Sequence, residues 1–186
     1  MGRVLLNTQL SIKLPLMKSL ALVVLCLFTF NVLNAQQTFS VPEVTPEQEK
    51  EILYNHVIAY FAAGVTFAKA QGISTEDYGK YIGNEFKLFW NPDAGFVFFA
   101  NQMMFILKGV NPYSEMKIIE QSHKMVRFKM SNMDMLFKQG SAYGLTYKEF
   151  LTASEGVIST LADYMKVSFE QKVTDDGWYL VSLKAK

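Results

Sequence analysis

The sequence predicts an α+β fold: N-terminal helices, then a hairpin, a helix and a second hairpin. Three observations support this prediction. Apolar residues recur at helical spacing between residues 45 and 110, and they alternate with polar residues in 116–130 and in 165–184. The two alternating stretches are typical of hairpins, and together they predict a four-stranded antiparallel sheet. A layer of helices covering one face of that sheet is the economical way to bury its apolar side.

The N-terminus is typical of a secretory signal peptide. Lys18 precedes an apolar run from Leu20 to Phe30, and Ala35 offers a small residue for cleavage before Gln36. The run is shorter than the ~20 apolar residues that a membrane-spanning helix needs. We therefore expect a secreted or periplasmic protein with no stable membrane insertion after cleavage. An uncleaved N-terminal anchor is the alternative.

These features predict how the 186 residues are divided. Residues 1–35 are assigned to the signal peptide, 36–44 to a short polar lead and 45–186 to a single α+β domain. The sequence leaves open whether translation starts at Met1 or at Met17.

The charge balance argues against nucleic acid as a partner. Of the 18 basic residues, Arg3, Lys13 and Lys18 are lost with the leader, which leaves 15 against 17 acidic residues. Arg127 is then the only arginine. A chain with this composition has no positive surface to hold a phosphate backbone.

Cysteine usage limits the chemistry further. Cys26 is the only cysteine, and it lies in the predicted signal peptide. The mature domain therefore has no disulfide, thiolate nucleophile or thiolate metal ligand, and we expect its apolar core alone to hold it together.

The first helix begins at Thr45, where Gln48 completes a capping box, and Gly72 ends it after about Gln71. We expect one inward stripe at helical spacing. Its members are Leu53, Val57, Tyr60, Phe61, Gly64, Val65 and Ala68.

The second helix begins after Ser74, with cap chemistry that Asp77 completes. Its expected buried face consists of Tyr78, Ile82, Phe86 and Phe89. Gly79 and Gly83 lie four residues apart, so they would allow another helix to approach closely. The Asn91-Pro92 pair ends this part of the chain.

The segment from Gly95 to Gly109 is the least polar in the domain. Only Asn101, Gln102 and Lys108 interrupt it, and we expect a helix. A helix that is apolar on nearly every side must be surrounded by its own domain or by something bound to it.

The remaining elements follow from period-two alternation and one capping box. Residues 116–120 and 125–130 form the first predicted hairpin, and a short helical piece is expected around Leu136. Thr146 and Glu149 form a capping box that opens a helix to about Asp163. The second hairpin turns at residues 174–177.

Few residues suggest catalysis. His56 and His123 are predicted on separate elements, and no cluster has the spacing of a metal site, so we expect neither a metal nor a cofactor. A carboxyl in an apolar pocket could act as acid or base, which makes a metal-independent hydrolase the alternative function. The carboxylates considered for that role are Glu85, Asp93, Glu155 and Asp163.

One arrangement resembles a known group of proteins. The run from Ala68 to Gly83, followed by Trp90 and by a hairpin–helix–hairpin ending at Trp178, resembles L-2-amino-thiazoline-4-carboxylic acid hydrolase-like proteins. It also resembles the related vinyl-reductase small-molecule-binding domains. The resemblance implies their fold and a ligand pocket. Their cysteine positions are occupied here by residues 131–132 and 179–180, so no catalytic residue is carried over.

We therefore expect an exported domain that binds a small, mostly apolar ligand without catalysis, between the 95–109 helix and the sheet. Trp90, Phe99, Met103 and Phe128 are the predicted ligand-binding residues. A protein–protein interaction module is the second alternative, in which the same helix meets a partner. The sequence leaves open whether the chain forms a homodimer.

Overall fold

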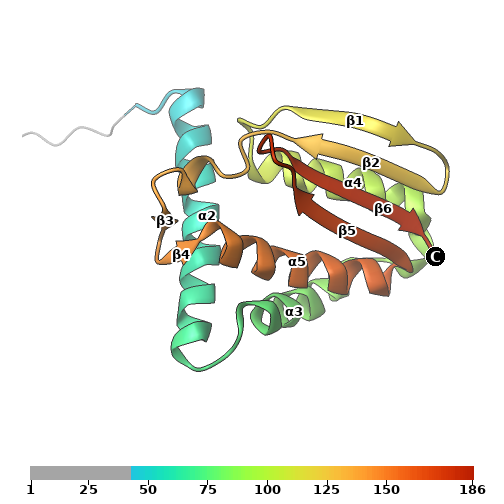
Figure 1. The fold of residues 1–186 in the computed structure, drawn as a ribbon, viewed down its shortest axis with the longest axis horizontal. Helices are drawn as coiled ribbons and strands as arrows, with labels where there is room; N and C mark the ends of the chain where they lie inside the picture. Colours follow the sequence, from blue (N-terminus) through green and yellow to red (C-terminus); the bar gives the residue numbers. More distant parts are fainter. Residues whose placement is uncertain (1–42) are drawn as a thin grey trace, which may run out of the picture. The chain divides into compact units, whose positions relative to one another are not determined.

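The computed structural model describes residues 43–186, and it has the predicted α+β architecture (Figure 1). The helices are α2 (Pro46–Ala70), α3 (Thr75–Phe86), α4 (Gly95–Val110) and α5 (Tyr147–Tyr164). The strands are β1 (Met116–Gln121), β2 (Met125–Met130), β3 (Ser141–Ala142), β4 (Leu145–Thr146), β5 (Val167–Val173) and β6 (Tyr179–Ala185). Three short 3₁₀ turns, η1 (Lys87–Phe89), η2 (Pro92–Ala94) and η3 (Met135–Phe137), join them.

The predicted signal peptide and most of the polar lead lie outside the described residues. Within the described range, no helix is long and apolar enough to cross a membrane.

The two predicted hairpins form one antiparallel sheet in the order β1-β2-β6-β5. The hairpins join through their second strands, because β2 pairs with β6 and places Phe128 opposite Val181. Side chains alternate between the two faces of a strand. Val126, Phe128 and Met130 are therefore buried together, as the alternation in the sequence predicts.

Helices α4 and α5 cover one face of this sheet. Phe99 and Met103 of α4, together with Leu161 of α5, belong to the same buried cluster as the inward residues of β2, β5 and β6. In Figure 1, α4 lies behind the strands. Burying one such large apolar side chain contributes about 1.5–3 kcal/mol, and this cluster supplies most of the core.

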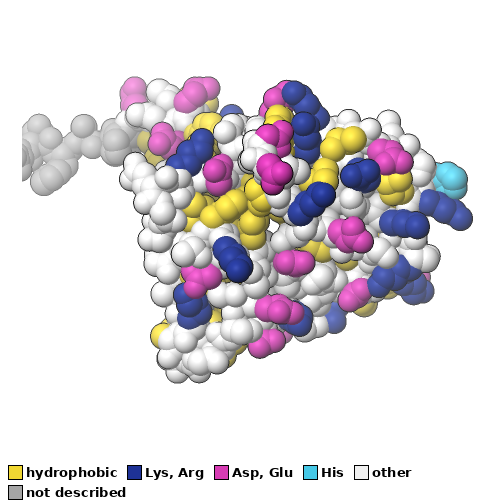
Figure 2. Space-filling model, in the orientation of Figure 1, with side chains coloured by type: hydrophobic (Ala, Val, Ile, Leu, Met, Phe, Trp, Pro, Cys, Tyr) yellow, Lys and Arg dark blue, Asp and Glu magenta, His cyan; other side chains and the backbone are white. Residues whose placement is uncertain are grey.

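The opposite face of the sheet is polar. Figure 2 shows basic and acidic side chains interspersed over this side of the molecule. Arg127 pairs with Glu120 at 3.4 Å, and the Lys129 ammonium lies 4.2 Å from the centre of the Trp178 ring. Arg127 thus lies on the outward side of β2, with a partner from the neighbouring strand.

The close approach predicted from Gly79 and Gly83 occurs between α3 and α5. A Cβ atom at Gly79 would overlap the carbonyl oxygen of Ala153, and one at Gly156 would lie 2.6 Å from the Glu76 carbonyl oxygen. The missing side chains let the two helix backbones touch, which buries Gly79 and Gly83.

The predicted helix starts are confirmed. Thr45 and Gln48 form the capping box of α2, and Thr146 and Glu149 form that of α5. The Ser74 side chain accepts a hydrogen bond from the Asp77 backbone amide at 3.0 Å. Each cap provides a partner for an otherwise unpaired amide of the first turn.

The predicted inward stripe of the first helix is wrong in part. α2 buries Tyr54, Ile58, Ala62, Val65 and Ala68. Leu53, Val57 and Tyr60 of the predicted stripe instead keep 58%, 48% and 76% of their surface exposed. Both sets recur at helical spacing, so periodicity alone cannot decide which of two neighbouring stripes faces the rest of the fold.

The predicted buried face of the second helix also needs correction. Phe86 and Phe89 are 48% and 84% exposed, because α3 turns its glycines toward α5. The segment from Gly95 forms the predicted helix, but the described domain surrounds only one side of it. Phe98 and Phe105 of α4 face outward.

Candidate functional site

An apolar hollow lies between three helices, on the flank of α4 that faces α2 and α5. We call it the inner hollow, and its volume is about 260 Å³. α2 contributes Val57, Ile58 and Phe61, α4 contributes Ile106, Leu107 and Val110, and α5 contributes Phe150, Leu151, Ser154, Val157 and Ile158; Phe86, Met133 and Tyr179 complete the lining. No charged residue is among them.

Only two side chains of the inner hollow carry oxygen, those of Ser154 and Tyr179. The Tyr179 hydroxyl donates a hydrogen bond to the Gln171 side chain, so its proton is already engaged. Burial raises the pKa of Tyr179 far above its ordinary value, and the ring stays neutral. The Ser154 hydroxyl is therefore the remaining polar feature of an otherwise apolar wall.

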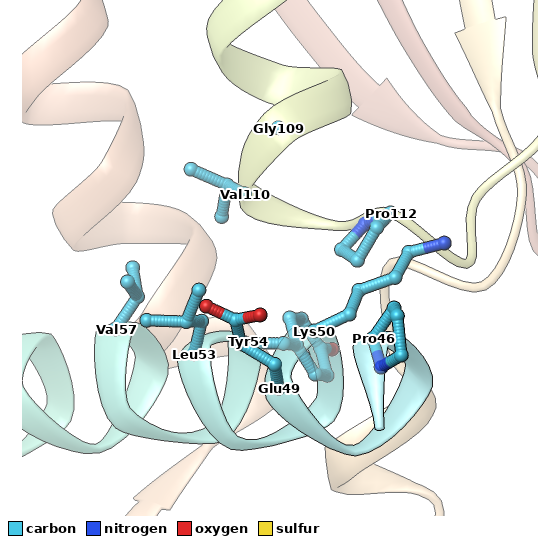
Figure 3. Close-up of a pocket in the computed structure, with 9 residues that line it drawn as sticks. All are labelled: Pro46, Glu49, Lys50, Leu53, Tyr54, Val57, Gly109, Val110 and Pro112. Atoms are coloured by element: carbon cyan, nitrogen blue, oxygen red, sulfur yellow. The ribbon is translucent and has the colours of Figure 1, made fainter. Parts of the chain in front are cut away.

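A second hollow adjoins the first, and we call it the outer hollow. It lies between the first half of α2 and the end of α4, with a volume of about 310 Å³ (Figure 3). Pro46, Glu49, Lys50, Leu53, Tyr54, Val57, Gly109, Val110 and Pro112 line it. Val57 and Val110 line both hollows, so the two adjoin along the groove between α2 and α4.

A turn at the end of α4 fixes one wall of the outer hollow. The Asn111 side-chain nitrogen Nδ2 donates a hydrogen bond to the Asn132 carbonyl oxygen at 2.8 Å, and its side-chain oxygen accepts one from the Tyr113 backbone amide at 3.1 Å. Asn111 is only 2% exposed. Each polar atom of this buried side chain has a partner, which holds Pro112 in place beside α2.

The four residues predicted to bind a ligand occupy the core instead of these hollows. Phe99 and Phe128 are fully buried, and Met103 is 3% exposed. Trp90 packs against the same cluster, with its ring centre 5.3 Å from that of Phe99. Phe99, Met103 and Phe128 belong to the buried cluster between α4 and the sheet, and none of the four residues lines either hollow.

The carboxylates considered for hydrolysis do not converge. Glu85, Asp93, Glu155 and Asp163 are all exposed. The described residues contain no group of three or more potential ligands that could hold a metal ion.

The two histidines lie apart from the hollows. His56 is exposed on α2, where Nδ1 lies 2.7 Å from the Ile52 carbonyl oxygen one turn back. His123 is exposed between β1 and β2. Neither histidine lines either hollow.

The sequence contained one signal for the inner hollow. The first helix carries two apolar stripes at helical spacing, of which only one is needed to bury it. Val57 of the exposed stripe lines both hollows, beside Ile106 of α4, which is 40% exposed. A helix with a surplus apolar stripe indicates an additional contact, but the sequence does not say which element forms the opposite wall.

In comparisons with known proteins, no family model, curated protein or solved structure matches the chain.

Proposed function

We propose that this domain binds a small, mostly apolar molecule in the inner hollow and does not transform it. The observation that carries the proposal is a cavity of about 260 Å³ whose lining includes no charged side chain. Small-molecule sites are concave and mostly apolar, with a few polar groups that fix orientation. The hydroxyl of Ser154 is the polar group that would orient the ligand in the inner hollow.

The residues at the rim of the inner hollow are partly exposed, which supports entry of a ligand from solvent. Val57, Phe86 and Ile106 are 48%, 48% and 40% exposed, so apolar surface continues from the hollow to the outside of the domain. A bound apolar molecule would remove this surface from water, which is favourable by about 25 cal/mol per Å².

The test is binding of N-phenyl-1-naphthylamine, a neutral apolar dye that fluoresces when it leaves water. Ser154→Phe places a ring inside the inner hollow and should weaken dye binding at least about tenfold. Ser168→Phe is the matched control, because Ser168 is exposed on β5 and does not line the hollow.

A second variant keeps the test valid if Ser154→Phe fails to fold. Ile106→Ser changes a rim residue that is already 40% exposed, so it should weaken binding severalfold at a smaller cost in stability than a fully buried residue would carry. If the unmodified protein does not bind the dye, or if all three variants bind it equally, the proposal is wrong.

Protein–protein interaction is a second candidate, and one observation favours it. Phe98 and Phe105 lie on the outward side of α4 at 43% and 75% exposure. Leu88 and Phe89, more than 80% exposed, directly precede Trp90, whose ring centre lies 6.2 Å from that of Phe98. Exposed apolar surface of this kind marks contact sites when it forms one continuous patch.

We propose a second copy of the chain as the occupant of this face. Native mass spectrometry of protein purified from its own host measures the subunit number and any retained ligand together. A dimer that Phe105→Ser converts to a monomer would support self-association. A monomer at high micromolar concentration would refute it.

A further inference from the structure

The outer hollow differs from the inner one in one respect, because charged side chains reach it. Glu49 and Lys50 both line it. Figure 3 shows the Glu49 carboxylate directed into the space between α2 and Val110, whereas the Lys50 chain runs along Pro112 and carries its ammonium group away from that space.

The Lys50 ammonium is already engaged elsewhere. It lies 5.5 Å from the centre of the Tyr113 ring, at a distance typical of a cation–π contact. The Tyr113 ring in turn meets Tyr54 edge-on at 5.7 Å. The charge that faces the outer hollow is therefore negative, and a tyrosine ring forms part of the wall beside it.

The start of α2 is mainly acidic, and Lys50 is the only basic residue between Glu47 and Glu51. Glu47 and Glu51 are each two residues from Glu49, so they project from the other side of the helix and do not line the outer hollow. Glu49 is therefore the carboxylate that gives the outer hollow its negative charge.

The two hollows together form one elongated site whose two ends differ in charge. Glu49 and Phe61 lie twelve residues apart on α2, which corresponds to about 18 Å along the helix axis. One end has the Glu49 carboxylate beside Tyr54, and the other is an apolar cavity with no charged residue in its lining.

We propose that the ligand is a cationic amphiphile. Its ammonium head lies against Glu49 and Tyr54 in the outer hollow, and its apolar chain extends past Val57 and Val110 into the inner hollow. This inference rests on the proposed function, because it names the class of molecule that the same site binds.

The experiment compares three dodecyl compounds that differ only in the head group: dodecylammonium, dodecanol and dodecanoate. Each compound is titrated into the full protein with bound N-phenyl-1-naphthylamine, and displacement of the dye is measured. All concentrations stay below the critical micelle concentration or, for dodecanol, below the solubility limit. We expect dodecylammonium to bind roughly tenfold more tightly than dodecanoate, the effect of one close charge pair near a protein surface. Added salt should reduce this preference.

Two variants assign the preference to one carboxylate. Glu49→Gln should abolish it and leave dodecanol binding unchanged. Glu47→Gln removes the same charge from the same helix at a position that does not line the hollow, so it should retain most of the preference.

Each alternative result has a distinct meaning. If dodecanol binds but the head-group charge has no effect, the cationic head is refuted and the proposed function stands. If dodecanoate binds most tightly and Lys50→Gln abolishes that binding, the head is anionic and the inference is overturned. If neither the dye nor any dodecyl compound binds, the proposed function and this inference both fall, whatever the subunit number.

Discussion

Single polar residues hold together parts of the chain that lie far apart in the sequence. Glu149 completes the capping box at the start of α5 by accepting hydrogen bonds from the Thr146 amide and hydroxyl, both at 2.9 Å. The same carboxylate pairs with Lys69 at the end of α2. The capping role follows from local sequence, whereas the ion pair requires the two helices to meet.

These contacts make one contribution to stability depend on pH. The hydrogen bonds from Lys69 and Thr146 lower the pKa of Glu149 from 4.5 to about 2. A depressed pKa stabilises the fold above the unfolded value, and this stabilisation is lost as pH falls from about 4.5 toward 2. Because both side chains are about a third exposed, we expect on the order of 1 kcal/mol.

The measurement compares denaturant unfolding of the unmodified protein with that of Glu149→Gln. The variant should be less stable by about 1 kcal/mol near pH 7, and the difference should vanish near pH 2. Glutamine also fits a capping box, so the comparison isolates the charge. A difference that grows as the pH falls would contradict this assignment.

At the scale of elements, helix packing depends on glycines without side chains as well as on buried apolar residues. α3 approaches α5 through Gly79, Gly83 and Gly156, and its aromatic residues Tyr81 and Phe86 are exposed. α4 is nearly all apolar, yet it buries only Phe99, Ala100 and Met103. The apolar composition of a helix therefore does not by itself say how much of that helix is buried.

Gly79→Ala tests this contact. The new methyl group would overlap the Ala153 carbonyl oxygen, and we expect a loss of about 1–3 kcal/mol in unfolding free energy. Gly109→Ala is the matched control, since its added Cβ meets no atom within 4 Å beyond the adjoining backbone of its own helix. It should raise stability by up to about 1 kcal/mol through helix propensity. Equal denaturation midpoints for the two variants would refute close packing of α3 on α5.

The whole domain separates a closed core from an accessible hollow, and α4 takes part in both. One flank of α4 packs on the sheet through Phe99 and Met103. The flank that carries Ile106 and Val110 lines the inner hollow. The sequence marks all these residues as apolar and cannot separate the two flanks.

One substitution on each flank of α4 should distinguish the buried core from the inner hollow. Phe99→Ala removes a fully buried ring and should cost about 3–5 kcal/mol of unfolding free energy. Ile106→Ala should cost distinctly less, because its side chain is 40% exposed, but it should weaken binding of the apolar dye. Unfolding curves and dye titrations on the same samples measure both effects. A larger stability loss for Ile106→Ala would contradict this division.

The sequence by itself determined the elements and their order. Capping boxes at Thr45 and Thr146, the proline at residue 92 and the two period-two stretches act over a few residues, so their consequences can be derived locally. The glycine pair of α3 also predicted a close helix contact.

Only the tertiary structure decided which apolar residues are core and which line a cavity. Both environments select the same residue types, and the difference depends on what lies opposite each side chain. Leu53 and Tyr54 are neighbours on α2, yet one is 58% exposed and the other is buried at 6%. Their difference arises because Tyr54 packs in one buried cluster with Phe137, Leu145 and Phe150, whereas Leu53 faces the open outer hollow.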